Sequence, residues 1–117
     1  MHNLKELNIW KKAIELTTEV YRITSKFPNE EKFGLISQLR RASVSIASNI
    51  AEGAGRNSDK EFIQFLGIAN GSSFEVQTQI IIAYRLKFID KENSNLIIDK
   101  INEIQKMNRG LQNKLRQ

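Results

Sequence analysis

The chain of 117 residues has no cysteine, a single histidine and a single proline. Without cysteine it can form neither a disulfide nor a thiolate metal site, and it suits a reducing cytoplasm. The histidine, His2, lies beside the chain start, so a Ser–His catalytic pair would depend on that terminus. The longest aliphatic run, from Ile80 to Ala83, is too short for a transmembrane helix. We therefore expect a cytoplasmic protein that does not enter the membrane and is not an enzyme.

The composition is that of one ordinary soluble domain spanning residues 1–117, with 40% hydrophobic and 26% charged residues. The formal net charge is +5, and it is unevenly spread. Basic and acidic residues cancel between 59 and 89, whereas four bases and no acid follow from Lys106 onward. Such an excess fits either binding to a polyanion or plain solubility.

The rarity of proline and of strand-like alternation predicts an all-α fold. Apolar residues recur at three- and four-residue steps in four segments, so we expect helices over about 5–26, 30–53, 58–88 and 91–116. Phe-Pro-Asn at 27–29 separates the first two, and Gly-Ala-Gly at 53–55 is expected to end the second. Ser58 and Glu61 form a capping box for the third. The short connections favour an antiparallel up-down-up-down four-helix bundle.

Helices 30–53 and 58–88 carry more apolar surface than a bundle core requires. Outside the core stripe, the expected interface residues are Val44, Ala47, Ala51, Ile68 and Ile82. Because the excess occurs on two helices independently, we expect the chain to associate with copies of itself. The surplus has an alternative explanation: the helices curve, or their core-facing sides are rotated slightly from those assigned here by residue spacing.

A polar row follows the flank of helix 30–53: Gln38, Arg41, Ser45, Asn49, Glu52 and Arg56. Ser72, Glu75 and Gln79 recur at matching intervals on helix 58–88. We therefore expect the two rows to meet in a structural polar network of Arg41, Asn49, Glu52 and Glu75, which would fix helix register. Catalysis by Glu52 and Glu75 is the weaker alternative, because no nucleophile is aimed at them.

The candidate nucleic-acid-binding residues are Arg40, Arg41, Arg56, Lys60, Lys106, Arg109, Lys114 and Arg116. Phosphates need only cations within reach, so a basic surface repeated around an oligomer would bind better than one copy. Solvated or ion-paired side chains are the alternative for each. Glycines 53 and 55 do not form a phosphate-binding loop, since the Gly-Lys-Ser/Thr ending is missing. No metal or cofactor is expected.

One pattern spans nearly the whole chain and is densest between Phe27 and Glu75. Its elements are Phe27-Pro28, Phe33-Gly34-Leu35, QLRRASVSIASNIAEG at 38–53, Arg56, Ser58, Glu61-Phe62, Phe65-Leu66, Ile68-Ala69-Asn70-Gly71-Ser72 and Glu75. This pattern resembles the bacterial four-helix-bundle family encoded in intervening sequences of 23S rRNA genes. That family is similar to the accessory variability proteins of diversity-generating retroelements.

The resemblance implies an antiparallel bundle that assembles into a ring-like homo-oligomer, a pentamer, with a role near RNA or DNA. In the retroelement relatives the basic ring is associated with nucleic acid and with a partner reverse transcriptase. Arg40, Arg41 and Arg56 match basic positions of the pattern, and no catalytic residues transfer. Two functions therefore stay open: nucleic-acid binding, and an adaptor for a protein such as a reverse transcriptase.

Overall fold

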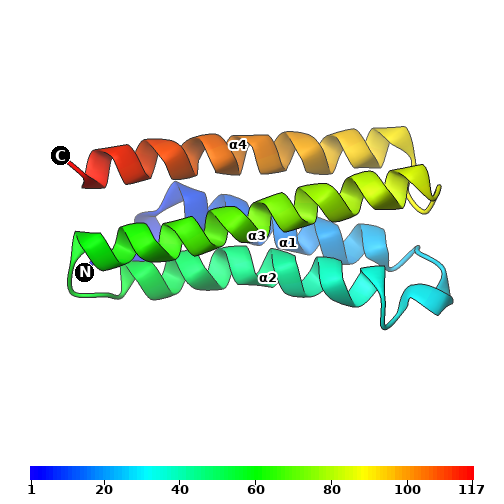
Figure 1. Ribbon diagram of the computed structural model, residues 1–117, viewed down its shortest axis with the longest axis horizontal. Helices are drawn as coiled ribbons and strands as arrows, with labels where there is room; N and C mark the ends of the chain where they lie inside the picture. The colour runs from blue at the N-terminus through cyan, green and yellow to red at the C-terminus, as the bar shows by residue number, and fades with distance from the viewer.

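The computed structural model describes residues 1–117 and contains helices but no strand. The four long helices are α1 (Asn8–Thr24), α2 (Leu35–Ala54), α3 (Asp59–Arg85) and α4 (Lys91–Leu115); two short 3₁₀ helices are η1 (Leu4–Glu6) and η2 (Asn29–Glu31). Figure 1 shows the chain running in opposite directions in successive helices, with both termini at one end. The all-α prediction with four helices is confirmed. None of these helices is long and apolar enough to cross a membrane.

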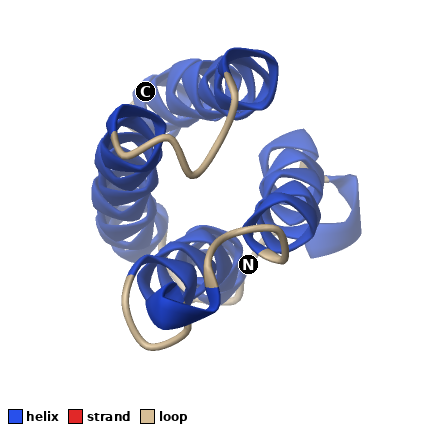
Figure 2. Cartoon of the chain, turned by 90° about the vertical axis from the view of Figure 1, so that its right-hand side faces the viewer, coloured by secondary structure: helices blue, strands red, loops and turns tan.

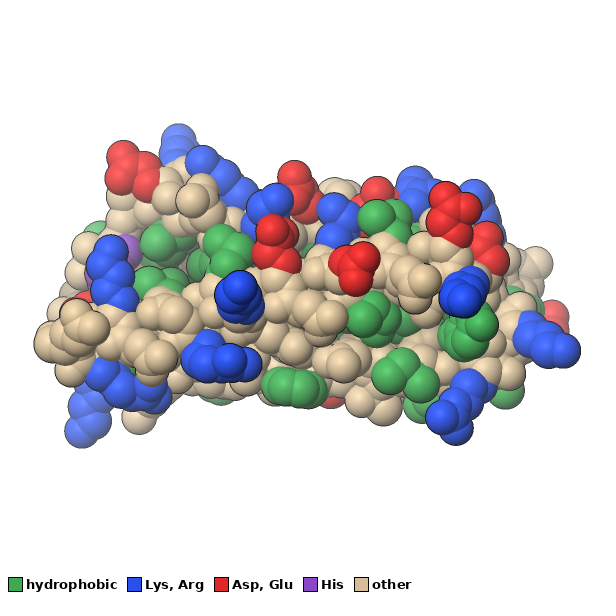
Figure 3. Space-filling view, turned by 90° about the horizontal axis from the view of Figure 1, so that it is seen from above, with side chains coloured by type: hydrophobic (Ala, Val, Ile, Leu, Met, Phe, Trp, Pro, Cys, Tyr) green, Lys and Arg blue, Asp and Glu red, His purple; other side chains and the backbone are tan.

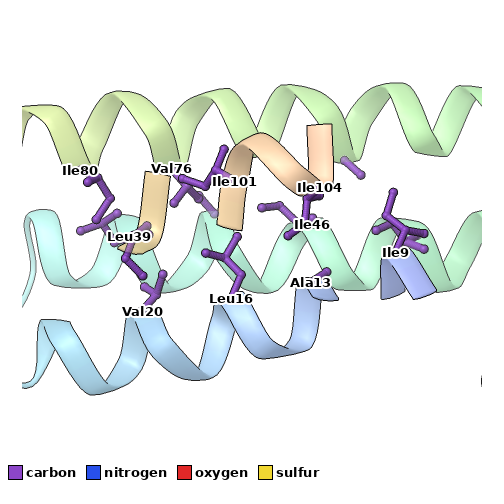
Figure 4. Close-up of a cluster of buried hydrophobic side chains, with 14 of the residues drawn as sticks. Ile9, Ala13, Leu16, Val20, Leu39, Ile46, Val76, Ile80, Ile101 and Ile104 are labelled. Carbon is purple, nitrogen blue, oxygen red and sulfur yellow. The ribbon is translucent and has the colours of Figure 1, made fainter. Parts of the chain in front are cut away.

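The helices surround one apolar core that runs the length of a 44 × 23 × 20 Å molecule (Figure 2). Each helix supplies a stripe of fully buried side chains, such as Leu16, Ile46, Val76 and Ile101 (Figure 4). The contact between α2 and α3 is the most extensive, and that between α1 and α4 the least of the four neighbouring pairs. The α2–α3 pair therefore forms the most tightly joined part of the bundle.

The second helix begins later than the sequence predicted, at Leu35 rather than near residue 30. The acidic residues after Pro28 form η2 instead. The Glu31 side chain then accepts a hydrogen bond from the backbone N–H of Leu35 at 3.1 Å and so caps α2. A Cβ on Gly34 would lie 2.7 Å from that carboxylate oxygen, so a larger residue here would have to displace the Glu31 side chain. The first helix likewise begins at Asn8, preceded by η1.

The second helix ends at Ala54 with Gly55 as its C-cap, within the Gly-Ala-Gly segment that was expected to end it, but Gly53 itself lies inside the helix. Neither Gly53 nor Gly55 has a positive φ, so neither forms a left-handed cap. Instead, a Cβ on Gly53 would lie 2.7 Å from the Cβ of Phe65 and 2.9 Å from Cδ1 of Phe62. Glycine is therefore needed here because α2 and α3 approach each other closely.

The third helix ends at Arg85, three residues before the predicted end, in a Schellman motif. Phe88 N–H bonds to the Ala83 carbonyl at 2.9 Å, and Lys87 N–H bonds to the Tyr84 carbonyl at 3.0 Å. Lys87 has φ 64°, the left-handed conformation that this motif requires. At the other end of α3 the predicted cap is confirmed, because Ser58 Oγ accepts from Glu61 N–H at 3.2 Å.

Candidate nucleic-acid interface

The carboxylates around the α2–α3 turn are already paired. Arg56 lies 3.1 Å from Glu52 and 4.0 Å from Glu61, and its guanidinium also lies over the Phe65 ring. Asp59 lies 3.0 Å from the ring nitrogen of His2. Arg56 is therefore held in place, and its charge is largely compensated by two neighbouring acids.

Other cations at this end of the bundle include Lys60 on α3 and, in the C-terminal half of α4 and directly after it, Lys106, Arg109, Lys114 and Arg116. All five are exposed, and none lies within ion-pair distance of a carboxylate. In Figure 3 blue side chains predominate at the left end, whereas red and blue alternate toward the right. We define the basic end as these five residues together with Arg56.

The opposite end of the bundle carries lysines too, and acids stand beside two of them in the chain, as Asp59 and Glu61 stand beside Lys60 at the basic end. Glu30 and Glu31 precede Lys32, and Asp90 and Glu92 flank Lys91. Their charges cancel locally within a Debye length. The stretch of α4 from Lys106 to Arg116 contains no acid, so the least compensated positive charge that a polyanion meets lies at the basic end.

The two adjacent arginines, Arg40 and Arg41, do not belong to the basic end. Arg40 is half-buried: its Nε donates to Thr24 Oγ1 at 3.0 Å, Nη2 donates to the Tyr21 carbonyl at 3.4 Å, and the guanidinium lies 4.6 Å from the Tyr21 ring centroid. Arg40 thus fastens α2 to α1. Arg41 is exposed beside α3, farther from the α2–α3 turn. The eight predicted basic residues therefore do not form one face.

The polar row of α2 does face α3. Ser45 and Ser72 hydroxyls lie 3.0 Å apart, and Asn49 Nδ2 donates to the Ser45 carbonyl at 2.8 Å. Gln79 Nε2 donates to Gln38 Oε1 at 3.4 Å. The expected ionic part does not form, because Glu52 pairs with Arg56, and neither Arg41 nor Glu75 makes an ion pair. Arg41 and Glu75 instead line an open groove of about 540 Å³.

The predicted interface residues lie on two separate faces. Ile68 and Ile82 are 52% and 43% exposed on α3. Val44 is also exposed, but it stands one turn after Arg40, on the side of α2 that meets α1. Ala47 and Ala51 are half-buried, and Ala47 packs against the core. The exposed apolar surface outside the core is therefore greatest on α3.

The sequence interpretation missed an amide cluster between α3 and α4. Asn108 is 1% exposed; its Nδ2 donates to the Leu66 carbonyl at 2.9 Å, and its Oδ1 accepts from Gln112 Nε2 at 2.6 Å. Gln105 Nε2 donates to Ser73 Oγ at 3.2 Å and to Gln77 Oε1 at 3.0 Å. The available signal was the spacing of Gln105, Asn108 and Gln112, which places three amides on one side of a helix.

The four-helix architecture, the polar seams between its helices and the basic end define a small all-α bundle protein. The model of the 23S rRNA-intervening sequence protein family matches residues 5–110, and the chain belongs to that family. A crystal structure of a protein of unknown function from the S23 ribosomal protein family of Bacteroides thetaiotaomicron VPI-5482 is similar in fold, with a TM-score of 0.83. It shares 25% sequence identity, and the match covers 90% of this chain and 95% of that one. No curated protein matches the chain.

Proposed function

We propose that this chain is a non-catalytic protein whose antiparallel up-down-up-down bundle assembles into a ring-like homo-oligomer, a pentamer, and binds structured RNA or DNA. The observation that supports the proposal best is the basic end, where Lys60, Lys114 and Arg116 project without carboxylate partners. Repetition of that surface around a ring would place several such ends against one polyanion. Each cation that neutralises a phosphate releases condensed counterions, so affinity grows with the number of contacts.

The proposal is tested by light scattering on a sizing column, with and without a structured ribosomal RNA fragment, at two salt concentrations. We expect a closed oligomer that elutes with RNA at low salt and without it at high salt, because counterion release drives the binding. An oligomer that never elutes with RNA would contradict nucleic-acid binding. A monomer at all concentrations would contradict the ring.

The proposed assembly predicts that the exposed isoleucines of α3 lie in the interface between subunits. Replacing Ile68 and Ile82 together by glutamate should convert the oligomer to monomers, because two charges would be buried in an interface. Both side chains are exposed in the single subunit, so its helicity should not change. The matched control replaces Ile14 on α1 and Leu96 on α4 by glutamate, at 38% and 37% exposure. If both double variants keep the oligomer, α3 is not the interface.

The alternative function, an adaptor for a partner protein such as a reverse transcriptase, is favoured by a different observation. Besides the two interface isoleucines, Phe74 and Ile81 on α3 and Leu86 directly after it are also exposed. Such a surface fits a protein partner better than a polyanion. The adaptor function predicts that a purified partner stays bound after nuclease treatment and in high salt, whereas an RNA-bridged complex dissociates.

A further inference from the structure

A small groove between α3 and α4 combines features that the other cavities lack. It holds about 120 Å³ and is lined by Asn70, Phe74, Gln105, Asn108, Arg109, Gln112 and Arg116. Two guanidinium groups and four amides line it, and no carboxylate does. Each of the other three cavities includes either Glu75 or Asp90. This groove is therefore the one concave site in the protein whose charge is wholly positive.

Three of the four amides of the groove, those of Gln105, Asn108 and Gln112, are held by hydrogen bonds. Asn108 is tied to the Leu66 carbonyl at 2.9 Å, and Gln112 is tied to Asn108 at 2.6 Å. Gln112 Oε1 in turn accepts from Arg116 Nη2 at 3.1 Å, so the chain of hydrogen bonds runs from a buried backbone group to an exposed cation. Donors and acceptors that are already oriented lose little conformational entropy when a ligand binds.

Phe74 and Arg109 stand at the rim of the groove. Phe74 is 52% exposed although it lies in the middle of a long helix, and no aromatic ring of the protein stacks on it. Arg109 is exposed and has no ion-pair partner. An exposed aromatic ring beside unpaired cations is the combination on which single-stranded nucleic acids bind, with bases on the ring and phosphates on the cations.

We propose that this groove binds an unpaired nucleotide of single-stranded RNA. The base stacks on Phe74, the amides of Asn70 and Gln112 meet its hydrogen-bonding edge, and Arg109 contacts the adjacent phosphate. A duplex hides the edges of its bases, whereas loops and bulges present them to aromatic and amide side chains. The inference rests on the proposed RNA-binding function and narrows its ligand from RNA in general to an unpaired segment.

The test compares a fluorescent single-stranded oligoribonucleotide with the same strand in a perfect duplex, using the full chain and fluorescence anisotropy. The variant is Phe74→Leu, which keeps an apolar side chain on α3 but removes the aromatic face. We expect it to bind the single strand about tenfold more weakly, as the loss of one stacked base implies. Binding of the duplex should not change. The control is Phe33→Leu, at 89% exposure on the connection before α2.

A second variant, Arg109→Gln, checks the phosphate contact. Affinity for the single strand falls as salt rises, and in this variant the slope of log affinity against log salt should be less steep by about 0.7, the value expected for one lost phosphate contact. If the parent protein binds the single strand and Phe74→Leu binds it equally well, the groove assignment is wrong while RNA binding stands. If the parent protein does not bind the single strand at all, this inference fails, and the sizing-column measurement with the structured ribosomal RNA fragment decides the proposed function separately.

Discussion

Replacing Lys60, Lys114 and Arg116 together by glutamate is expected to weaken RNA binding about 100-fold at moderate salt. All three are exposed, make no ion pair and lie at the basic end, so each is free to meet a phosphate. The substitution removes three attractive contacts and adds three repulsive charges. The measurement is a binding isotherm with a structured ribosomal RNA fragment at several salt concentrations, and the salt dependence should become shallower.

The matched control makes the same change of net charge at the opposite end of the bundle, with Lys26, Lys32 and Lys91 replaced by glutamate. These lysines are also exposed, but acidic residues near Lys32 and Lys91 already offset their charge. We expect this control to weaken binding far less. Equal losses in the two triple variants would mean that RNA responds only to net charge, and the assignment of the basic end would be wrong.

Replacing Phe62 by alanine is expected to lower the free energy of unfolding by about 3–5 kcal/mol. Phe62 is fully buried, lies where α2 and α3 approach each other at Gly53, and contacts the His2 ring at a centroid distance of 4.9 Å. Removing its ring leaves a cavity that the closely packed backbones cannot fill. The measurement is urea unfolding followed by circular dichroism, at one fixed protein concentration because assembly contributes to stability.

The same substitution at Phe33 provides the control. Phe33 is 89% exposed, so Phe33→Ala should change the free energy of unfolding by no more than about 0.5 kcal/mol. If the loss at Phe62 were as small, the α2–α3 contact at this end would be looser than the close approach at Gly53 implies.

Much of the fold could be predicted because local signals and core periodicity agreed. The cap predicted at Ser58 and Glu61 formed within one turn: Ser58 Oγ accepts from the Glu61 N–H, and the Glu61 carboxylate accepts from the Ser58 hydroxyl rather than from its backbone N–H. The error at Gly53 has a physical cause: a glycine near a helix end is equally compatible with a cap and with a close helix contact. Only the positions of Phe62 and Phe65 on the facing helix distinguish the two.

The candidate site was less predictable, because it also depends on which side chains the facing helix supplies. Arg40 and Arg41 look alike in the sequence, yet Arg40 is held by Tyr21 and Thr24 of α1 while Arg41 is exposed. Charge and spacing specify where a cation stands on its own helix, but not which groups the neighbouring helix brings to it. The α3–α4 groove could be predicted only with the register between the two helices, because its residues, such as Asn70 and Gln112, are distant from each other in the sequence.

The shared position of the two termini has a practical consequence for any fusion protein. Both ends of the chain lie at the end of the bundle that carries the basic residues, and the backbone N–H of His2 bonds there to the Ala54 carbonyl at 2.8 Å. A reporter attached at either terminus would therefore crowd that surface. A circular permutant that joins the old termini and opens the chain between α3 and α4, near Asp90, would carry its reporter at the far end instead.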